Sequence, residues 1–155
     1  MSFSYDVKEE LSRQPSESCC QKAELAALVQ MAGTIRIVGG EKKVLLQVQT
    51  VHPPTARRVY RLFRKNFPSP IQIAVKRNSF LKDKRLYIIT IDTKYCKSLL
   101  EELGIIPQKE GIELNKAIMN QNLIKKDCCK RSFLRGAFLG GGSISNPKGP
   151  YHMEF

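Results

Sequence analysis

The chain of 155 residues carries 26 basic and 14 acidic side chains, a formal net charge of +12, and 42% of its residues are hydrophobic. This length predicts one ordinary domain with a buried core, and no apolar run is long enough for a membrane span, which argues against a transmembrane protein. Residues 1–13 contain acids and no apolar core, so we expect no signal peptide and read the five cysteines as reduced cytoplasmic thiols.

The positive charge is concentrated in the middle of the chain. Residues 34–97 carry 15 basic and 3 acidic side chains, whereas residues 1–33 carry 3 basic and 5 acidic ones. Such a concentration favours a polyanionic partner, most often nucleic acid. A solubilising surface is the alternative.

The predicted elements of the first two thirds of the chain are helices alternating with pairs of strands. Phe3, Val7 and Leu11 recur at helical spacing and predict a short N-terminal helix. A second helix is predicted over about Cys19–Ala32, and Gly33 is expected to end it in the left-handed conformation. The elements that follow are predicted as strands Thr34–Val38 and Lys43–Val51, a helix over Pro54–Asn66, strands Ile71–Arg77 and Arg85–Ile91, and a helix capped by Asp92 or Thr93 that ends near Leu103.

The helix over Pro54–Asn66 is strongly amphipathic. Its buried side is predicted to comprise Ala56, Val59, Tyr60, Phe63 and Phe67. Its opposite side is predicted to expose Arg57, Arg58, Arg61, Arg64 and Lys65.

An internal repeat relates residues 18–35 to residues 127–144 at a constant offset of 109 residues. Five of the eighteen paired positions are identical, and these pairs are Cys19 and Cys128, Cys20 and Cys129, Leu25 and Leu134, Gly33 and Gly142, and Ile35 and Ile144. The repeat predicts a helix to about Gly140, then Ser143–Ser145 and a strand over Tyr151–Phe155. We therefore divide the chain into an N-terminal helix and loop (1–18), a first repeat (19–104), a linker with one short helix (105–126) and the start of a second repeat (127–155), which we expect to be truncated.

Both repeat helices carry a face of small residues. Gly136 and Gly140 lie four residues apart, a spacing that lets two helix backbones approach closely. The first copy has Ala23, Ala26 and Ala27 on a comparable face. We predict that the two helices pack together across a local two-fold axis.

Two segments now carry a specific resemblance. LAALVQMAG (Leu25–Gly33) and LRGAFLGGG (Leu134–Gly142) resemble two degenerate LAGLIDADG motifs, and the αββαββα order between them is that of one half of a LAGLIDADG homing endonuclease. More closely, the start MSFSYDVKEEL and the blocks that begin at Cys19-Cys20 and Cys128-Cys129 resemble the WhiA-type bacterial regulators of sporulation and cell division, from end to end of the chain. Those proteins are longer and end in a helix-turn-helix DNA-binding domain.

The resemblance implies an α/β (α+β) fold in which an antiparallel sheet forms a saddle over double-stranded DNA. Candidate DNA contacts are then on the strands, because arginine and lysine contact phosphate or guanine and glutamine can read adenine. They are Arg36, Lys43, Gln47, Gln49, Gln72, Lys76 and Arg85. Strand register decides which face each occupies. The basic side of the helix over Pro54–Asn66 would point away from the saddle, as a solvated face or a second contact.

The resemblance also bears on catalysis. In the nucleases, the acid before the last motif glycine binds divalent cations, but Ala32 and Gly141 occupy those positions here. We therefore predict a nuclease scaffold without nuclease chemistry, and no cofactor. Glu24 lies too far along its helix to replace the acids.

The two Cys-Cys pairs lie at the starts of the repeat helices, and symmetry brings them together only if those starts converge. Four thiolates could then hold zinc. Adjacent cysteines are expected to point in different directions, so we favour buried, reduced thiols and predict no metal. His52 and His152 are read as structural or surface residues.

The favoured hypothesis is a non-catalytic DNA-binding scaffold of a bacterial transcription regulator involved in sporulation, cell division and chromosome segregation. It would be cytoplasmic, associated with the nucleoid and without a membrane partner. The alternative is a protein- or ligand-interaction module that no longer binds DNA. An active metal-dependent nuclease is least favoured. Because we expect the second repeat to be truncated, we also expect an exposed sheet edge, and self-association of the fragment through that edge would be an artefact of the truncation.

Overall fold

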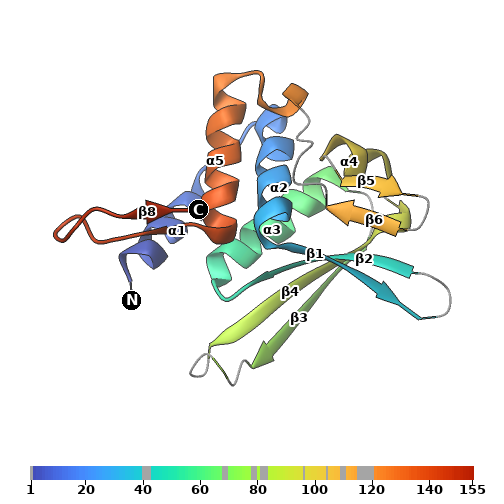
Figure 1. The fold of residues 1–155 in the computed structure, drawn as a ribbon, viewed down its shortest axis with the longest axis horizontal. Helices are drawn as coiled ribbons and strands as arrows, with labels where there is room; N and C mark the ends of the chain where they lie inside the picture. Colours follow the sequence, from blue (N-terminus) through green and yellow to red (C-terminus); the bar gives the residue numbers. More distant parts are fainter. Residues whose placement is uncertain are drawn as a thin grey trace.

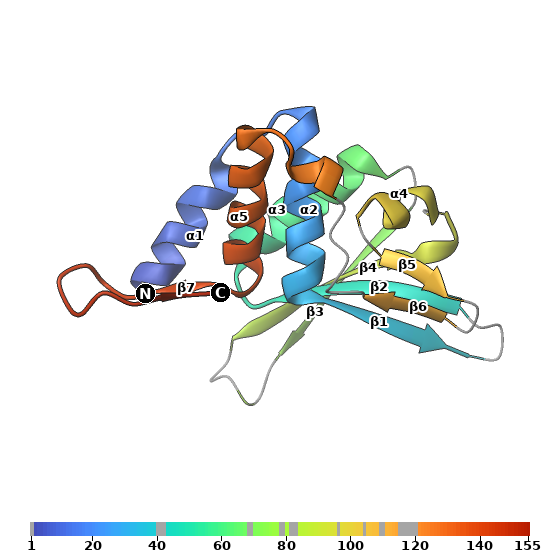
Figure 2. The same ribbon diagram turned by 45° about the horizontal axis from the view of Figure 1, so that its top comes forward.

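The computed structural model describes residues 2–39, 43–67, 70–77, 80, 84–95, 97–103, 105–108, 111–114 and 121–155. Its centre is a twisted four-stranded antiparallel sheet with the main helices on one side (Figures 1 and 2). Within these residues, no helix combines the length and the apolar character that crossing a lipid bilayer requires.

The sheet has the strand order β1-β2-β4-β3. Its strands are β1 (Gly33–Val38), β2 (Lys43–Thr50), β3 (Ile71–Arg77) and β4 (Arg85–Asp92). Every neighbouring pair is antiparallel, so β2 and β4 are central while β1 and β3 are the edges. The four predicted strands are confirmed to within a residue or two at each end.

Helices α2 (Ser18–Ala32) and α3 (Pro53–Asn66) pack on the sheet, while α1 (Phe3–Arg13) and α5 (Asp127–Gly141) pack beside these two helices. Helix α3 begins with two prolines, whose missing N–H groups cost nothing in a first turn. Its buried face, with Val59 and Phe63, packs with Leu28 of α2 and with Leu46 and Ile89 of the sheet in one apolar core.

The end of α2 differs from the prediction at Gly33. Its φ is −86°, an extended conformation, so the predicted left-handed stop is wrong. The glycine is needed for space instead, because a Cβ there would lie 2.3 Å from the carbonyl oxygen of Val29. The chain therefore passes from α2 directly into β1 without a turn residue.

The segment that follows the sheet is more regular than predicted. After β4 come a short 3₁₀ turn η1 (Thr93–Tyr95) and α4 (Lys97–Glu102), which complete the αββαββα order. The predicted linker contains the hairpin of β5 (Ile105–Gln108) and β6 (Gly111–Leu114), which the sequence reading missed, and the 3₁₀ turn η2 (Gln121–Ile124).

The second repeat begins as predicted, with α5 followed by a two-stranded hairpin of β7 (Ser143–Ile144) and β8 (Met153–Glu154). Helix α1 lies against this hairpin (Figure 1). The Ser4 hydroxyl donates a hydrogen bond to the Ile144 carbonyl and accepts one from the Ile144 N–H, both at 2.7 Å. The N-terminal helix is thereby attached to the second unit.

Candidate nucleic-acid interface

The side of the sheet that faces away from the helices is open (Figure 2). Strand alternation shows which side chains lie on it. Leu46 of β2 and Ile91 of β4 oppose each other and are buried under the helices, so Gln47 and Thr90, next to them, face the opposite way. The Gln47 amide donates a hydrogen bond of 3.3 Å to the Thr90 hydroxyl on this open face.

Six of the seven predicted DNA-contacting side chains lie on the open face. They are Arg36 of β1, Lys43, Gln47 and Gln49 of β2, and Gln72 and Lys76 of β3. Arg85 differs, because it alternates in phase with Ile89 and Ile91 and so belongs to the helix side, at the start of β4. The fold thus gathers side chains from three strands onto one surface.

Basic and amide groups give the open face its chemistry. Asp92 is the only acidic side chain on this face of the four strands, and its carboxylate lies 3.5 Å from the Lys43 ammonium. Arg36 and Lys76 are exposed on the two edge strands. The glutamines add groups that both donate and accept hydrogen bonds.

Helix α3 presents a second basic surface on the other side of the molecule. Arg57, Arg61, Arg64 and Lys65 are exposed on it as predicted. Arg58 is buried, so its predicted place in the exposed stripe is wrong. Tyr60, predicted to be buried, is half-buried, and its hydroxyl accepts a hydrogen bond of 2.8 Å from Arg64.

Helices α2 and α5 lie side by side with both N-terminal ends on the same side (Figures 1 and 2). A Cβ added at Gly136 would lie 2.3 Å from the Glu24 carbonyl oxygen and 3.0 Å from the Ala27 Cβ. Ala27 and Gly136 are equivalent positions of the repeat, so their contact lies on the local two-fold axis. The backbones approach so closely that only glycine fits.

The other small residues predicted at this contact lie at different positions along the two helices. Ala23 is fully buried and packs with Cys20 and Cys129 near the helix starts. A Cβ at Gly140 would lie 2.9 Å from the Met31 Cβ, towards the helix ends. Ala26 is buried in the main core, which α2 shares with α3 and the sheet.

The positions of the absent acids lie at the C-terminal ends of the paired helices, where the chain enters β1 and β7. A Cβ at Gly140 would be 3.7 Å from the Ala32 Cβ, and one at Gly141 would be 2.7 Å from the Met31 Cε. The two helix ends therefore meet through methyl groups and backbone, with no oxygen ligand at Ala32 or Gly141.

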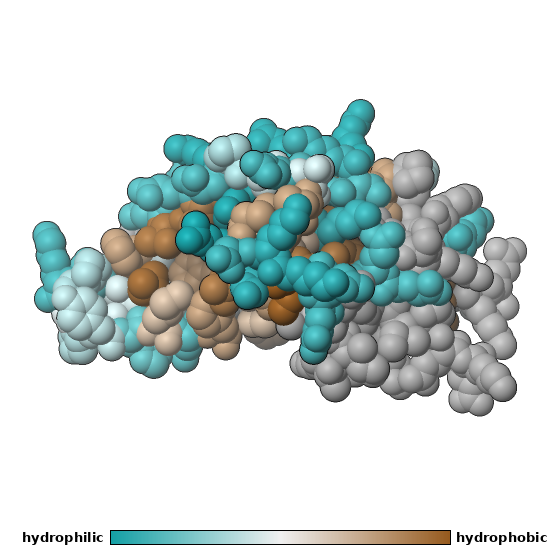
Figure 3. All heavy atoms as spheres, turned by 90° about the horizontal axis from the view of Figure 1, so that it is seen from above, coloured by the Kyte–Doolittle hydropathy of each residue, from teal (hydrophilic) through white to brown (hydrophobic). Residues whose placement is uncertain are grey.

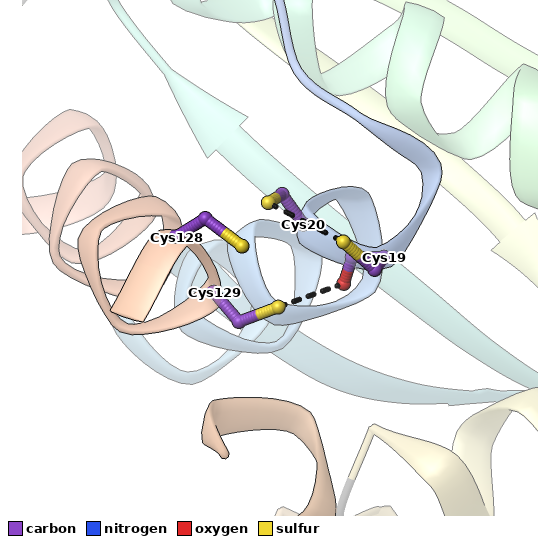
Figure 4. Close-up of side chains that lie close together, drawn as sticks. All are labelled: Cys19, Cys20, Cys128 and Cys129. Atoms are coloured by element: carbon purple, nitrogen blue, oxygen red, sulfur yellow. Dashed lines mark hydrogen bonds between the residues drawn. The ribbon is translucent and has the colours of Figure 1, made fainter. Parts of the chain in front are cut away.

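The four paired cysteines meet at the opposite end of the two helices. Their Sγ atoms all lie within 4.8 Å of one another (Figure 4). Adjacent cysteines therefore do not point apart as expected, since both helix starts converge on one point. Burial, with hydrogen bonds to Cys19, Cys128 and Cys20, raises the pKa of the Cys129 thiol to about 12. Among the described residues, these four form the only group of three or more His, Cys, Asp or Glu side chains placed to share a metal ion.

A buried ion pair beside this contact was not predicted. Glu24 of α2 is fully buried and accepts hydrogen bonds of 2.7 and 2.8 Å from the Arg58 guanidinium of α3. Arg135 of α5 also approaches, with Nη1 at 3.9 Å from the Glu24 Oε2. Nothing in the spacing of the sequence pairs residues 24 and 58, although an acid flanked by apolar residues, as Glu24 is by Ala23 and Leu25, indicates that a buried partner is needed.

Comparison with known proteins identifies the family. The sequence matches the WhiA N-terminal LAGLIDADG-like domain over residues 18–106 and the WhiA LAGLIDADG-like domain over residues 130–155. Relatives named "Probable cell division protein WhiA" include one from Heliobacterium modesticaldum, 42% identical over 156 residues, and one from Alkaliphilus metalliredigens, 40% identical over 158 residues. These matches cover 99% and 100% of this chain but 48% and 49% of the relatives, so the chain spans about half their length.

Two solved structures share the fold. The N-terminal LAGLIDADG domain of DUF199/WhiA matches with a TM-score of 0.69 and 25% identity, over 98% of this chain and 64% of that chain. Full-length DUF199/WhiA from Thermatoga maritima matches with a TM-score of 0.65 and 24% identity, over 99% of this chain and 44% of that chain. The predicted LAGLIDADG-like fold is confirmed.

Proposed function

The chain belongs to the family of WhiA N-terminal LAGLIDADG-like domains, and from this premise we propose that it is a non-catalytic DNA-binding scaffold of a bacterial transcription regulator. The regulator would act at the nucleoid, in cell division, chromosome segregation and sporulation. The cell-division part of this proposal is supported by the names of the relatives.

The observation that carries the proposal is the open face of the sheet. Arg36, Lys43 and Lys76 give it three cations against the single carboxylate of Asp92. Its edge-to-edge spread over four antiparallel strands suits a duplex, because phosphates on both strands of the DNA can be contacted at once. Glutamines between the cations would contact base edges or sugar with little sequence preference.

The absence of catalysis is inferred from the helix ends. Hydrolysis of a phosphodiester by two metal ions needs carboxylates beside the scissile bond. The chain places a methyl group at Ala32 and a bare backbone at Gly141, where the resemblance puts those acids. Magnesium-dependent DNA cleavage by the purified chain would contradict this part of the proposal.

The test is a salt titration of duplex binding, measured by fluorescence anisotropy. Each phosphate contact contributes about −0.9 to the slope of log K against log salt. The double variant Arg36→Gln, Lys76→Gln should therefore reduce the magnitude of the slope by about 2 and weaken binding to all sequences similarly. Circular dichroism would establish that the variant is folded.

The matched control removes the same charge from the other side of the molecule. The variant Arg61→Gln, Arg64→Gln changes two exposed cations on α3 and should leave the slope unchanged. Loss of binding in this control, with the open-face variant unaffected, would place the contact on α3. A wild-type chain that binds no duplex at low salt would refute the proposal altogether.

A second candidate function, contact with another protein, is favoured by an apolar groove of about 440 Å³ between α1, α5 and β8. Figure 3 shows apolar side chains gathered at the end of the molecule that carries the β7–β8 hairpin. Leu134 and Phe155 are 57% and 53% exposed there. If this function holds instead, the chain would bind no DNA and Leu134→Glu would abolish association seen by analytical ultracentrifugation.

A further inference from the structure

The four cysteines at the helix starts form a geometric unit that DNA binding does not require. Cys19 and Cys20 come from the first turn of α2, and Cys128 and Cys129 from the first turn of α5. Figure 4 shows all four side chains turned towards one point between the two helices. Because the pairs are equivalent in the repeat, that point lies on the local two-fold axis that also passes between Ala27 and Gly136.

The spacing of the sulfur atoms fits one tetrahedral ion. A zinc–sulfur bond of about 2.3 Å gives sulfur–sulfur edges of about 3.8 Å in a regular tetrahedron. Cys19 and Cys20 already have their Sγ atoms 3.8 Å apart. The remaining separations reach at most 4.8 Å, so closing the tetrahedron needs side-chain rotations and no rearrangement of the helices.

The chemistry of the ligands narrows the choice of ion. Thiolates are soft ligands that prefer zinc and other soft metals to magnesium or calcium. An iron–sulfur cluster holds several irons and bridging sulfides, so its four cysteine sulfurs lie farther apart than those here. Four protein ligands with no open position are typical of structural zinc.

Simple packing explains only half of the cluster. Cys20 and Cys129 are each 4% exposed and pack with Ala23, as small buried residues do. Cys128 is exposed and Cys19 is half-buried, yet both turn to the same point. Burial gives no reason for these two, whereas a shared ligand accounts for all four and their exposed side gives a metal ion access.

The two helix starts also favour negative charge. Burial raises the pKa of the Cys129 thiol and so opposes its deprotonation, and the partial positive charge of the two first helical turns offsets part of that cost. No side chain caps α2 at Glu17 or α5 at Lys126. The Cys129 Sγ already lies 3.4 Å from the Cys19 carbonyl oxygen, so the two helix starts are in direct contact.

We propose that Cys19, Cys20, Cys128 and Cys129 form a tetrathiolate site for one zinc ion, which joins the two repeats at the start of their paired helices. Binding exchanges four thiol protons for one Zn²⁺ and leaves a dianionic centre. The site holds one end of the helix pair, while the contact at Gly136 holds its middle.

The first test is metal content. The 155-residue chain, purified under reducing conditions without chelator, should contain one zinc per chain by inductively coupled plasma mass spectrometry. Cys20→Ser and Cys129→Ser should each weaken zinc affinity by more than about 100-fold, because outer-sphere changes alone cost about 10- to 100-fold. Cys96→Ser removes the fifth cysteine of the sequence, which is not one of the four proposed ligands, and should leave the zinc content unchanged.

The second test does not depend on whether the serine variants fold. Cobalt(II) titrated into the reduced, metal-free wild-type chain should give the visible bands and sulfur-to-cobalt charge transfer of a tetrahedral tetrathiolate, saturating at one equivalent and abolished by zinc. A reduced chain without zinc and without this spectrum would overturn the proposal. So would zinc retained in full by both Cys20→Ser and Cys129→Ser.

Discussion

Glu24 and Arg58 form an ion pair that is almost completely shielded from solvent. The carboxylate is 0% exposed and the arginine 8%. The Nη1 of Arg58 also donates to the carbonyl oxygens of Ser12, at 3.1 Å, and Gln14. The guanidinium therefore ties α2, α3 and the loop after α1 together, and both charges have partners only while these three segments stay in place.

Removing one partner should be costly. Arg58→Met would leave the buried Glu24 carboxylate with only the Arg135 guanidinium, 3.9 Å away, as a counter-charge, and breaking a buried pair from one side costs about 3–5 kcal/mol. We expect a loss of this size in the free energy of unfolding, measured by urea denaturation. Arg61→Met, the same change one turn later on the exposed side of α3, should stay within about 0.5 kcal/mol of wild type. Equal stabilities of the two variants would contradict the buried-pair interpretation.

Hydrophobic periodicity could not find this pair. The hydrophobic pattern of α3 predicts that its basic side chains are exposed to solvent, and Arg57, Arg61 and Arg64 are exposed. Arg58 lies at the boundary of that arc, and its burial depends on an acid 34 residues earlier in the chain. Pairings of this kind arise from the packing of α3 on α2, which local pattern does not encode.

At the scale of elements, the contact between α2 and α5 organises the fold. The sequence predicts this contact better than any other. Gly136 and Gly140 lower the stability of a helix, so their presence indicates that larger side chains would not fit there. The sequence does not predict the hairpin β5–β6, because Pro107 within β5 argues against a strand. The repeat indicated the meeting of the cysteines only as a condition, because it depends on how two helix starts 109 residues apart pack together.

Adding one methyl group should change the stability of the fold differently at Gly136 and at Gly141 of α5. Gly136→Ala gains helix propensity, yet its Cβ would lie 2.3 Å from the Glu24 carbonyl oxygen, which is backbone and cannot move aside cheaply. We expect the destabilisation from overpacking to exceed the gain in helix propensity and to lower the free energy of unfolding by about 1–3 kcal/mol. Thermal unfolding followed by circular dichroism measures it.

Gly141→Ala is the matched control, made five residues later in the same helix. Its Cβ would lie 2.7 Å from the Cε of Met31, the far end of a flexible side chain, and at an ordinary contact distance of 3.7 Å from the Met31 Cβ. We expect a change within about 1 kcal/mol, of either sign. Stabilisation by Gly136→Ala would show that the backbones are farther apart than described and would remove the case for a tight two-fold contact.

At the scale of the whole molecule, α1 joins the two units. Ser4 binds β7 of the second unit, and the Tyr5 ring packs edge-on against His52 at the start of α3 with centroids 4.3 Å apart. The N-terminal helix, which the sequence predicts as a separate segment together with its loop, therefore packs against both units. Its attachment should be sensitive to the charge on His52.

His52 is buried and held in its neutral form. Its Nδ1 accepts a hydrogen bond of 3.2 Å from the Thr55 N–H, so this nitrogen serves as the N-cap acceptor of α3 and carries no proton. Burial, and then the nearby Lys8 ammonium, lower the pKa of the His52 imidazole below its usual value. The Nε2 has no hydrogen-bond partner among the described residues.

The fold should consequently lose stability as the solution becomes mildly acidic. The unfolded chain binds a proton at residue 52 near the ordinary histidine pKa of about 6.5, while the folded chain resists it, so the unfolded state takes up more protons below that pH. The contribution of His52 is present in full above about pH 6.5 and declines as the pH falls towards the lowered folded-state pKa. His52→Asn keeps an N-cap acceptor without a titrating group. Melting temperatures measured between about pH 5 and pH 7.5 should fall less steeply for this variant than for wild type, and parallel curves would show that His52 does not couple protonation to folding.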